Sequence, residues 1–205
     1  MVKIYYEDND IVVCEKEYGI SSQKSDKENL IDLLNVQLNS EIYPVNRLDI
    51  GTTGIMVYAK NQASAAALSK EIADGVFKKA YICLCHGVID ESGEMVDFLY
   101  HDKLKNKSFA VKTKRRGTKE ARLEYKREFV DNEMLLSQVR VILHTGRTHQ
   151  IRVQFASRGF VLYGDGKYGA KDNDKIRLHS CEISFNHPVT KEKMCFTSSA
   201  KWQMQ

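Results

Sequence analysis

Two short polar segments of the chain carry the residue types that could do covalent chemistry. In the first, Asn46 to Gly54, the carboxylate of Asp49 stands between Arg47 and a Gly-Thr-Thr-Gly run. Gly51 and Gly54 permit backbone angles that other residues resist, and they let a bulky ligand approach the main chain. Asp49 is therefore a candidate nucleophile on a tight turn. The alternative is a turn aspartate that pairs with Arg47, and spacing alone favours this alternative.

The second segment, His144 to Arg152, is dense in polar and basic groups and follows an apolar strand-like run. The pattern predicts a helix from Thr148 to Arg158, whose first N–H groups would attract an anion. Arg152 lies one turn into this helix, on the same side as His149. Its guanidinium could keep a nearby carboxylate ionised. The alternative is a basic helix surface with no special role.

A third candidate is Tyr81, on a predicted strand from Ala80 to His86. A tyrosine at a strand start usually packs in the core, but its ring could also stack on a nucleobase. The nearby Cys83-x-Cys85-His86 has no second ligand pair at zinc-site spacing, so we expect no metal centre. The chain also lacks a Gly-x-Ser-x-Gly elbow, which argues against a serine hydrolase.

The formal net charge of +4 is too small to indicate nucleic-acid binding, but its distribution is informative. One stretch has no acidic residue and could neutralise several phosphates. The alternative is a solvated, mobile hairpin that keeps the protein soluble. The basic residues of this stretch are Lys103, Lys105, Lys107, Lys112, Lys114, Arg115, Arg116 and Lys119.

Composition places the chain among soluble globular proteins, with 42% hydrophobic and 28% charged residues. No apolar run approaches the roughly 18 residues that a membrane span requires. The first residues do not resemble a secretion signal. Five irregularly spaced cysteines favour free thiols in a reducing compartment. We therefore expect a cytoplasmic, monomeric protein of a single domain, residues 1–205.

Periodicity predicts the elements that must position these residues. Leucines at helical spacing predict a helix over 28–38, and Asn61 is the expected cap of a second helix over 62–74 that ends at Gly75. Alternating or β-rich sequence predicts the strands, which lie at 2–6, 11–15, 55–59, 80–86, 94–99, 121–130, 135–143, 176–185 and 194–197. Short helices among many strands indicate an α+β fold with a mixed, mostly antiparallel sheet.

In this order, the motifs resemble those of the RluA-type RNA pseudouridine synthases. The family signature His-Arg-Leu-Asp-x-x-Thr-Ser-Gly is matched by Asn46 to Gly54, and Lys-x-Tyr with a later Gly by Lys79, Tyr81 and Gly87. Thr-Gly-Arg-Thr-His-Gln-Ile-Arg-Val is matched in full from Thr145 to Val153. The remaining matches are Tyr6-Glu7-Asp8 with Lys16, Gly164-Asp165, Tyr168-Gly169, Leu178-His179 and His187-Pro188.

The resemblance implies a pseudouridine synthase fold with an RNA-binding cleft, and isomerisation of uridines in rRNA or tRNA without cofactor or metal. It implies that Asp49 is the nucleophile, that Tyr81 packs on the target uracil, and that Arg152 pairs with Asp49. A flipped-out uridine needs an aromatic face and a basic surface to hold it. The residues expected to contact RNA are Arg47, Arg147, His149, Gln150, Lys114, Arg115 and Arg116.

Some positions depart from the family pattern. Asn46 replaces the usual His, Glu17 the usual Pro, and Gln154 stands where His is common. About forty-five residues precede the signature, so we expect no S4 RNA-binding domain. Two rival interpretations remain: a catalytically silent RNA-binding protein with the same fold, and an unrelated hydrolase that uses Asp49 and a His.

Overall fold

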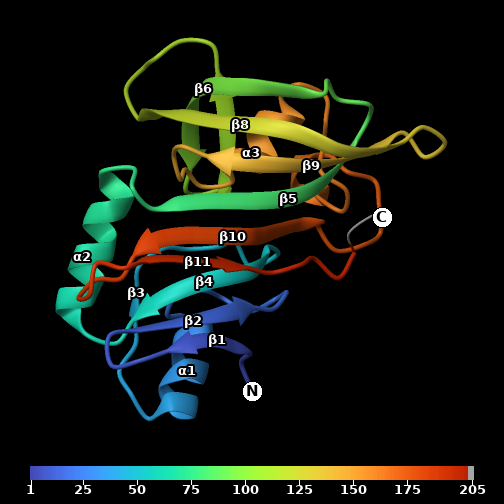
Figure 1. The fold of residues 1–205 in the computed structure, drawn as a ribbon. Coiled ribbons are helices and arrows are strands. Elements are labelled where there is room, and N and C mark those ends of the chain that lie inside the picture. Colours follow the sequence, from blue (N-terminus) through green and yellow to red (C-terminus); the bar gives the residue numbers. More distant parts are fainter. Residues whose placement is uncertain (203–205) are drawn as a thin grey trace. The chain divides into compact units, whose positions relative to one another are not determined.

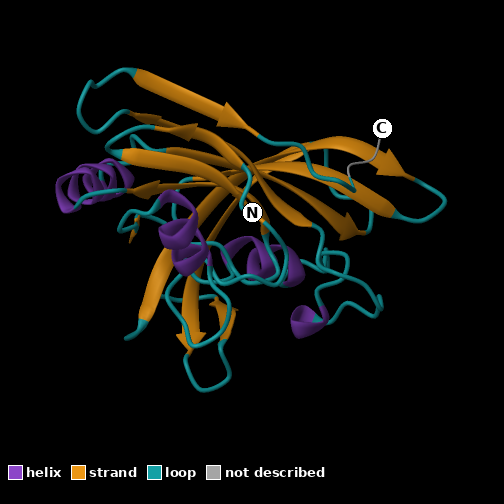
Figure 2. Ribbon diagram, turned by 90° about the horizontal axis from the view of Figure 1, so that it is seen from below, coloured by secondary structure: helices purple, strands orange, loops and turns teal. Residues whose placement is uncertain are grey.

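A computed structural model describes residues 1–202 of the chain. By internal packing these residues divide into two compact units. Unit 1 comprises Met1–Lys79 and His179–Ala200, and unit 2 comprises Ala80–Leu178 with the last residues of the chain. Strands dominate both units (Figure 2). Among the described residues, no helix combines the length and the apolar character that crossing a membrane requires.

Unit 1 is a mixed sheet with two helices (Figure 1). Its strands follow the order β1-β2-β4-β10, with β3 on β4 and β11 on β10. The pairing of β4 with β10 is parallel, whereas β1–β2, β2–β4, β3–β4 and β10–β11 are antiparallel. The elements are β1 (Ile4–Glu7), β2 (Ile11–Lys16), α1 (Leu30–Leu38), β3 (Tyr43–Pro44), β4 (Thr53–Ala59), α2 (Gln62–Ala73), β10 (Leu178–Asn186) and β11 (Lys193–Thr197).

The core of unit 1 lies on both faces of this sheet. Side chains alternate along a strand, so β2 and β4 send Ile11 and Ile55 to one face and Val12 and Met56 to the other. All four are fully buried. Leu68 of α2 packs on the first face together with the strand side chains. Because β2 and β4 are buried on both faces, each contains a continuous apolar run, 11–14 in β2 and 55–59 in β4.

Unit 2 is an antiparallel sheet with one short helix and a 3-10 turn. Its strands follow the order β5-β9-β8-β6-β7. Val153 of α3 packs on Leu99 and Ala121, so the helix covers one face of the β6–β8 pair. The elements are β5 (Lys78–His86), β6 (Ser92–Asp102), β7 (Lys107–Val111), β8 (Thr118–Asp131), β9 (Leu136–Leu143), α3 (Gln150–Ala156) and η1 (Gly166–Tyr168).

The α+β class and the mostly antiparallel pairing predicted from the sequence are confirmed. The side chain of Asn61 accepts the N–H of Ser64, as expected of the cap of α2. Two local predictions were wrong. The third helix begins at Gln150 instead of Thr148 and ends at Ala156, because His149 takes a left-handed conformation with φ 55°. Strand β7 was not predicted at all.

Candidate active site and RNA-binding surface

Asp49 lies on a turn that several hydrogen bonds fix inside unit 1. The N–H of Thr52 donates to the Asp49 carbonyl at 3.0 Å, which closes the turn. Before it, the Ser22 hydroxyl donates to the Leu48 carbonyl at 2.8 Å and accepts the Leu48 N–H at 3.1 Å. After it, the N–H of Gly19 donates to the Ile50 carbonyl at 2.9 Å. The Asp49 side chain itself is partly exposed, so the turn presents the carboxylate on a fixed backbone.

The buried side chain of Lys16 supports this turn. The ammonium of Lys16 is fully buried and donates to the carbonyls of Glu17, Ile20 and Ile50 at 3.0, 2.8 and 3.1 Å. Burial lowers the pKa of Lys16 to about 8, and the negative charge of Asp49 acts in the opposite direction. Lys16 thus places a positive charge near the candidate nucleophile and ties three backbone segments together.

The far end of the Asp49 segment is locked to strand β10. Gly54 has φ +116°, and a Cβ at this position would lie 2.3 Å from the Ser180 carbonyl oxygen. One residue earlier, the Thr53 hydroxyl lies 2.8 Å from Nδ1 of His179. Burial lowers the pKa of His179, which favours the neutral ring in this position. Gly54 is therefore required by close backbone packing, which explains one glycine of the signature.

In unit 2, Arg152 is held by a carboxylate that sequence reasoning did not single out for this role. Its Nε and Nη2 donate to the two carboxylate oxygens of Asp165, each at 2.7 Å. The Asp165 side chain is 1% exposed and that of Arg152 is 11% exposed. The guanidinium carbon also lies 5.2 Å from the ring centroid of Tyr168. A bidentate pair of this kind fixes the orientation of a guanidinium as well as its position.

The other predicted site residues of unit 2 differ in how accessible they are. Tyr81 is 6% exposed on strand β5. His149 and Gln150 are 8% and 3% exposed. The Gln150 side chain accepts the Thr145 hydroxyl and the Arg147 N–H at 2.8 and 3.0 Å, so it holds the turn before α3 together. RNA contact by His149 and Gln150 stays a prediction.

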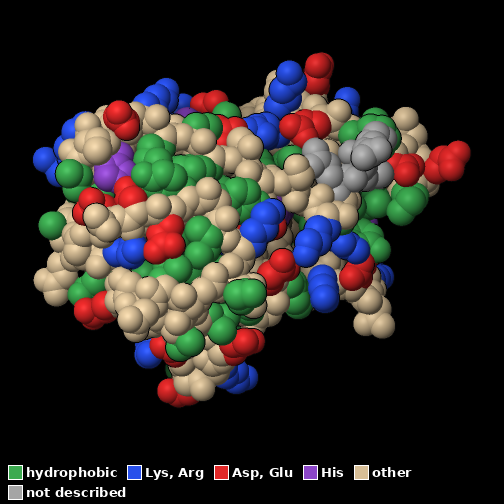
Figure 3. All heavy atoms as spheres, turned by 60° about the horizontal axis from the view of Figure 1, so that its bottom comes forward, with side chains coloured by type: hydrophobic (Ala, Val, Ile, Leu, Met, Phe, Trp, Pro, Cys, Tyr) green, Lys and Arg blue, Asp and Glu red, His purple; other side chains and the backbone are tan. Residues whose placement is uncertain are grey.

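Charge on the surface is unevenly distributed. The loop between β7 and β8 exposes Lys112, Lys114, Arg115 and Arg116, and the loop itself contains no acidic residue. By contrast, the face drawn in Figure 3 intersperses acidic and basic side chains. Arg47 of unit 1 is also exposed. Within the basic stretch, Lys107–Val111 forms strand β7, so this part of the stretch belongs to the sheet.

One group of side chains has the geometry of a metal site. Asp8, Asp10 and His187 each place a possible ligand atom within 4.8 Å of the others. However, Nδ1 of His187 accepts the N–H groups of Val189 and Thr190 at 3.3 and 3.1 Å. Nε2 therefore carries the proton and donates to Asp8 at 2.8 Å. This arrangement serves as a structural link between the β1–β2 and β10–β11 turns.

Comparison with known proteins identifies one family. A family model described as RNA pseudouridylate synthase matches residues 10–157. An uncharacterized RNA pseudouridine synthase of Mycoplasma pneumoniae is 31% identical over 94% of this chain and 65% of its own length. The dual-specificity RNA pseudouridine synthase RluA of Vibrio vulnificus is 30% identical over 91% of this chain and 78% of its own length.

The solved structures agree on the fold. Human RNA pseudouridylate synthase domain containing 1 is 20% identical, with a TM-score of 0.82 over 99% of this chain and 85% of that chain. Human RNA pseudouridylate synthase domain containing 4 has a TM-score of 0.80 at 18% identity, over 98% of this chain and 89% of that chain. The chain spans about 65% of the length of several curated relatives that it matches.

Proposed function

Because this chain belongs to the RNA pseudouridylate synthase family, we propose that it isomerises specific uridines in structured RNA to pseudouridine. The bond between C1′ of the ribose and N1 of uracil breaks, the uracil turns while it is held, and C5 then bonds to C1′. The reaction needs neither a cofactor nor a metal. The proposed substrate is rRNA or tRNA. Among the relatives, one is named as a ribosomal large subunit enzyme and another as dual-specificity.

The observation that carries this proposal is the fixed turn around Asp49. In our proposal the Asp49 carboxylate is the nucleophile. A nucleophilic carboxylate must meet the reacting atom in one geometry, and rigid placement contributes much of the rate in such reactions. The bonds to Leu48 and Ile50, together with the buried Lys16, supply that rigidity. Attack on the sugar, attack on the ring and a glycal route all use this carboxylate.

Two further residues complete the proposed site. Tyr81 packs on the target uracil and keeps the detached base in place, because an aromatic face stacks on any base. Arg152 contributes a guanidinium charge to the reaction, as the family resemblance implies. The bidentate bond to Asp165 orients this guanidinium in advance. The proposed RNA contacts are those of Arg47, Arg147, His149, Gln150, Lys114, Arg115 and Arg116.

The test is tritium release from RNA labelled at uridine C5, since C5 loses its hydrogen when it bonds to C1′. We expect release with the purified protein and none with Asp49→Ala or Asp49→Asn. Asp74→Asn is the matched control, because Asp74 is an exposed aspartate of the same unit. Full activity in both Asp49 variants would contradict the nucleophile assignment. No release from any cellular RNA pool would favour a catalytically silent RNA-binding protein.

The RNA itself is identified by mapping. We expect a strain that lacks the gene to lose pseudouridine at one or a few positions of rRNA or tRNA. Restoring the gene with Asp49→Asn should not restore the modification, whereas Asp74→Asn should. A strain with an unchanged pseudouridine map would refute the proposed activity in the cell.

A further inference from the structure

Unit 2 has a sheet face that carries exposed aromatic side chains. Leu99 of β6 and Ala121 of β8 point toward α3. Their strand neighbours point to the opposite face, because side chains alternate along a strand. On that outer face Tyr100 is 38% exposed and Val96 is 51% exposed. These side chains are not part of the core, and the proposed reaction does not use them.

The aromatic side chains of this face stand next to one another. Tyr100 of β6 is paired directly with Phe109 of β7, and Phe98 with Val111. Directly paired residues of antiparallel strands have side chains on the same face, about 5 Å apart. Phe109 is 37% exposed. Tyr100 and Phe109 thus offer two neighbouring rings at the edge of the sheet, and we call Phe98, Tyr100 and Phe109 the aromatic patch.

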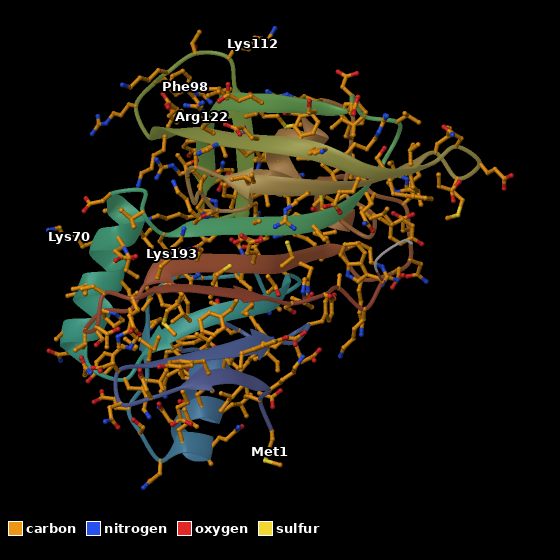
Figure 4. All side chains as sticks on the ribbon, viewed as in Figure 1. Met1, Lys70, Phe98, Lys112, Arg122 and Lys193 are labelled. Atoms are coloured by element: carbon orange, nitrogen blue, oxygen red, sulfur yellow. The ribbon has the colours of Figure 1, made fainter. Side chains whose placement is uncertain are left out.

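Positive charge borders the aromatic patch on the side of the β7–β8 loop. The guanidinium carbon of Arg115 lies 5.8 Å from the ring centroid of Tyr100. At the other end of β7, Lys107 places its ammonium 5.9 Å from the ring centroid of Phe109, and this ammonium donates to the Lys167 carbonyl at 2.6 Å. Figure 4 shows Phe98 of β6 and Arg122 of β8 beside the loop that carries Lys112. Between positions 103 and 119 the chain has no acidic residue.

The acidic residues of the same face are mostly neutralised. Glu94 and Glu124 both lie within ion-pair distance of Arg122. Asp102, paired with Lys107, and Glu120, paired with Phe98, mark the limits of the basic region. The end of the face at Tyr100 and Phe109 is therefore both aromatic and basic. This combination matches unpaired nucleotides, whose bases stack on rings while their phosphates attract cations.

We propose that the aromatic patch binds unpaired bases of the RNA outside the catalytic site, with Arg115 and its basic neighbours on the phosphates. The proposal rests on RNA being the substrate. It gives the enzyme a second contact with the RNA strand, on the sheet face opposite α3. Stacking is tolerant of sequence, so this contact adds affinity for flexible flanking RNA without selecting the uridine.

The experiment measures fluorescence anisotropy of a labelled 12-nucleotide oligoadenylate. This probe contains no uridine, so its binding does not depend on the reaction. Tyr100→Leu and Phe109→Leu keep apolar volume on the strands but remove the rings. We expect about tenfold weaker binding for each, and a larger loss for the double variant. Thermal unfolding should stay close to that of the wild type.

The matched control is Phe129→Leu. Phe129 is an equally exposed phenylalanine of β8, at 38%, next to Glu128 and away from the basic loop. It should bind the oligonucleotide as the wild type does. Equal losses in Phe129→Leu and Tyr100→Leu would overturn the proposal, and so would unchanged binding in the double variant. If Arg115→Ala loses oligonucleotide binding while Tyr100→Leu and Phe109→Leu keep it, the site is purely electrostatic, and this result would also overturn the proposal.

Two further measurements distinguish this proposal from the proposed reaction and from a dimer interface on the same face. Tritium release tests the catalytic function independently, so an inactive protein that binds oligoadenylate through the patch would refute only the reaction. Size-exclusion chromatography tests the alternative occupant, a second copy of the chain. A concentration-dependent dimer that disappears in Tyr100→Leu, with no change in oligonucleotide binding, would show a protein interface in place of an RNA site.

Discussion

The substitution Asp165→Asn would keep the shape of the side chain and remove the charge that orients Arg152. In the native pair, both carboxylate oxygens accept a guanidinium N–H at 2.7 Å, and the side chain of Asp165 is 1% exposed. Removing one partner of a buried ion pair costs about 3–5 kcal/mol, because the other charge stays buried without compensation. The amide of Asn still offers one acceptor, so we expect the lower end, about 3 kcal/mol.

In a chain of 205 residues this loss corresponds to a melting temperature lower by about 6–12 °C. Circular dichroism and urea unfolding measure it. At temperatures below the melting range, tritium release should fall about 10- to 100-fold through kcat. The reason is that a guanidinium displaced by about 1 Å no longer lies where the reaction requires it. KM for the RNA should change little, since Asp165 is buried.

The matched control is Asp174→Asn, which removes the charge from an exposed pair with Arg177 in the same unit. Its stability and activity should stay close to those of the wild type. If Asp165→Asn lowers the free energy of unfolding by less than about 1 kcal/mol, this buried pair is not essential to the local structure. A stability loss with full kcat would show that Asp165 does not position Arg152 for the reaction.

Two further predictions concern the support of the Asp49 turn. Gly54→Ala should lower the free energy of unfolding by at least about 3 kcal/mol, because a Cβ would lie 2.3 Å from the Ser180 carbonyl oxygen at φ +116°. Its control, Gly75→Ala, has φ +70° but open space around it and should lower this free energy by only about 1 kcal/mol. For Lys16, the folded pKa of about 8 lies below the usual 10.5, so the unfolded chain binds more protons between these values and stability rises with pH there. Relative to Lys16→Met, the wild type should gain about 3 kcal/mol in urea unfolding between pH 8 and 10.5.

The outcome of each experiment is specific. A Gly54→Ala protein as stable as Gly75→Ala would mean that β10 can move away from β4. A free-energy difference between wild type and Lys16→Met that does not change with pH would mean that the lysine is not desolvated. The comparison with Lys16→Met is needed because burial raises the pKa of Cys14 and Cys85 to about 12, which lowers stability at alkaline pH in both proteins.

Much of the fold follows from periodicity because most elements bury one face or two. Apolar runs predict β2 and β4 as buried strands, and leucines at helical spacing predict α1 as a helix. Strand β7 escaped prediction because it lies within the basic stretch. Its apolar residues, Phe109, Ala110 and Val111, are too few to outweigh the charges around them. Pairing with β6 and the hydrogen bonds of Ser108 to Tyr168 and Thr148 hold it as a strand.

The candidate site was less predictable from the sequence. Asp49, Tyr81 and Arg152 were named from motifs, and their catalytic roles stay predictions. The bond between Arg152 and Asp165 was missed, because a partner thirteen residues away on a turn follows no helical or strand spacing. The burial of Lys16 was missed as well. Lysine is normally exposed, and the three carbonyls that hold its ammonium come from backbone positions that no side chain reveals.

The division of the chain has a consequence for its synthesis. Unit 2 is built mainly from the continuous stretch Ala80–Leu178, whereas unit 1 needs residues 179–200 in addition to the first 79. A chain emerging from the ribosome can therefore form the strands of this stretch while β4 still lacks its parallel neighbour β10. Domains generally fold as soon as their residues are available. Although Asp49 is translated early, Thr53 and Gly54 at the end of its segment meet His179 and Ser180 only after β10 has been made.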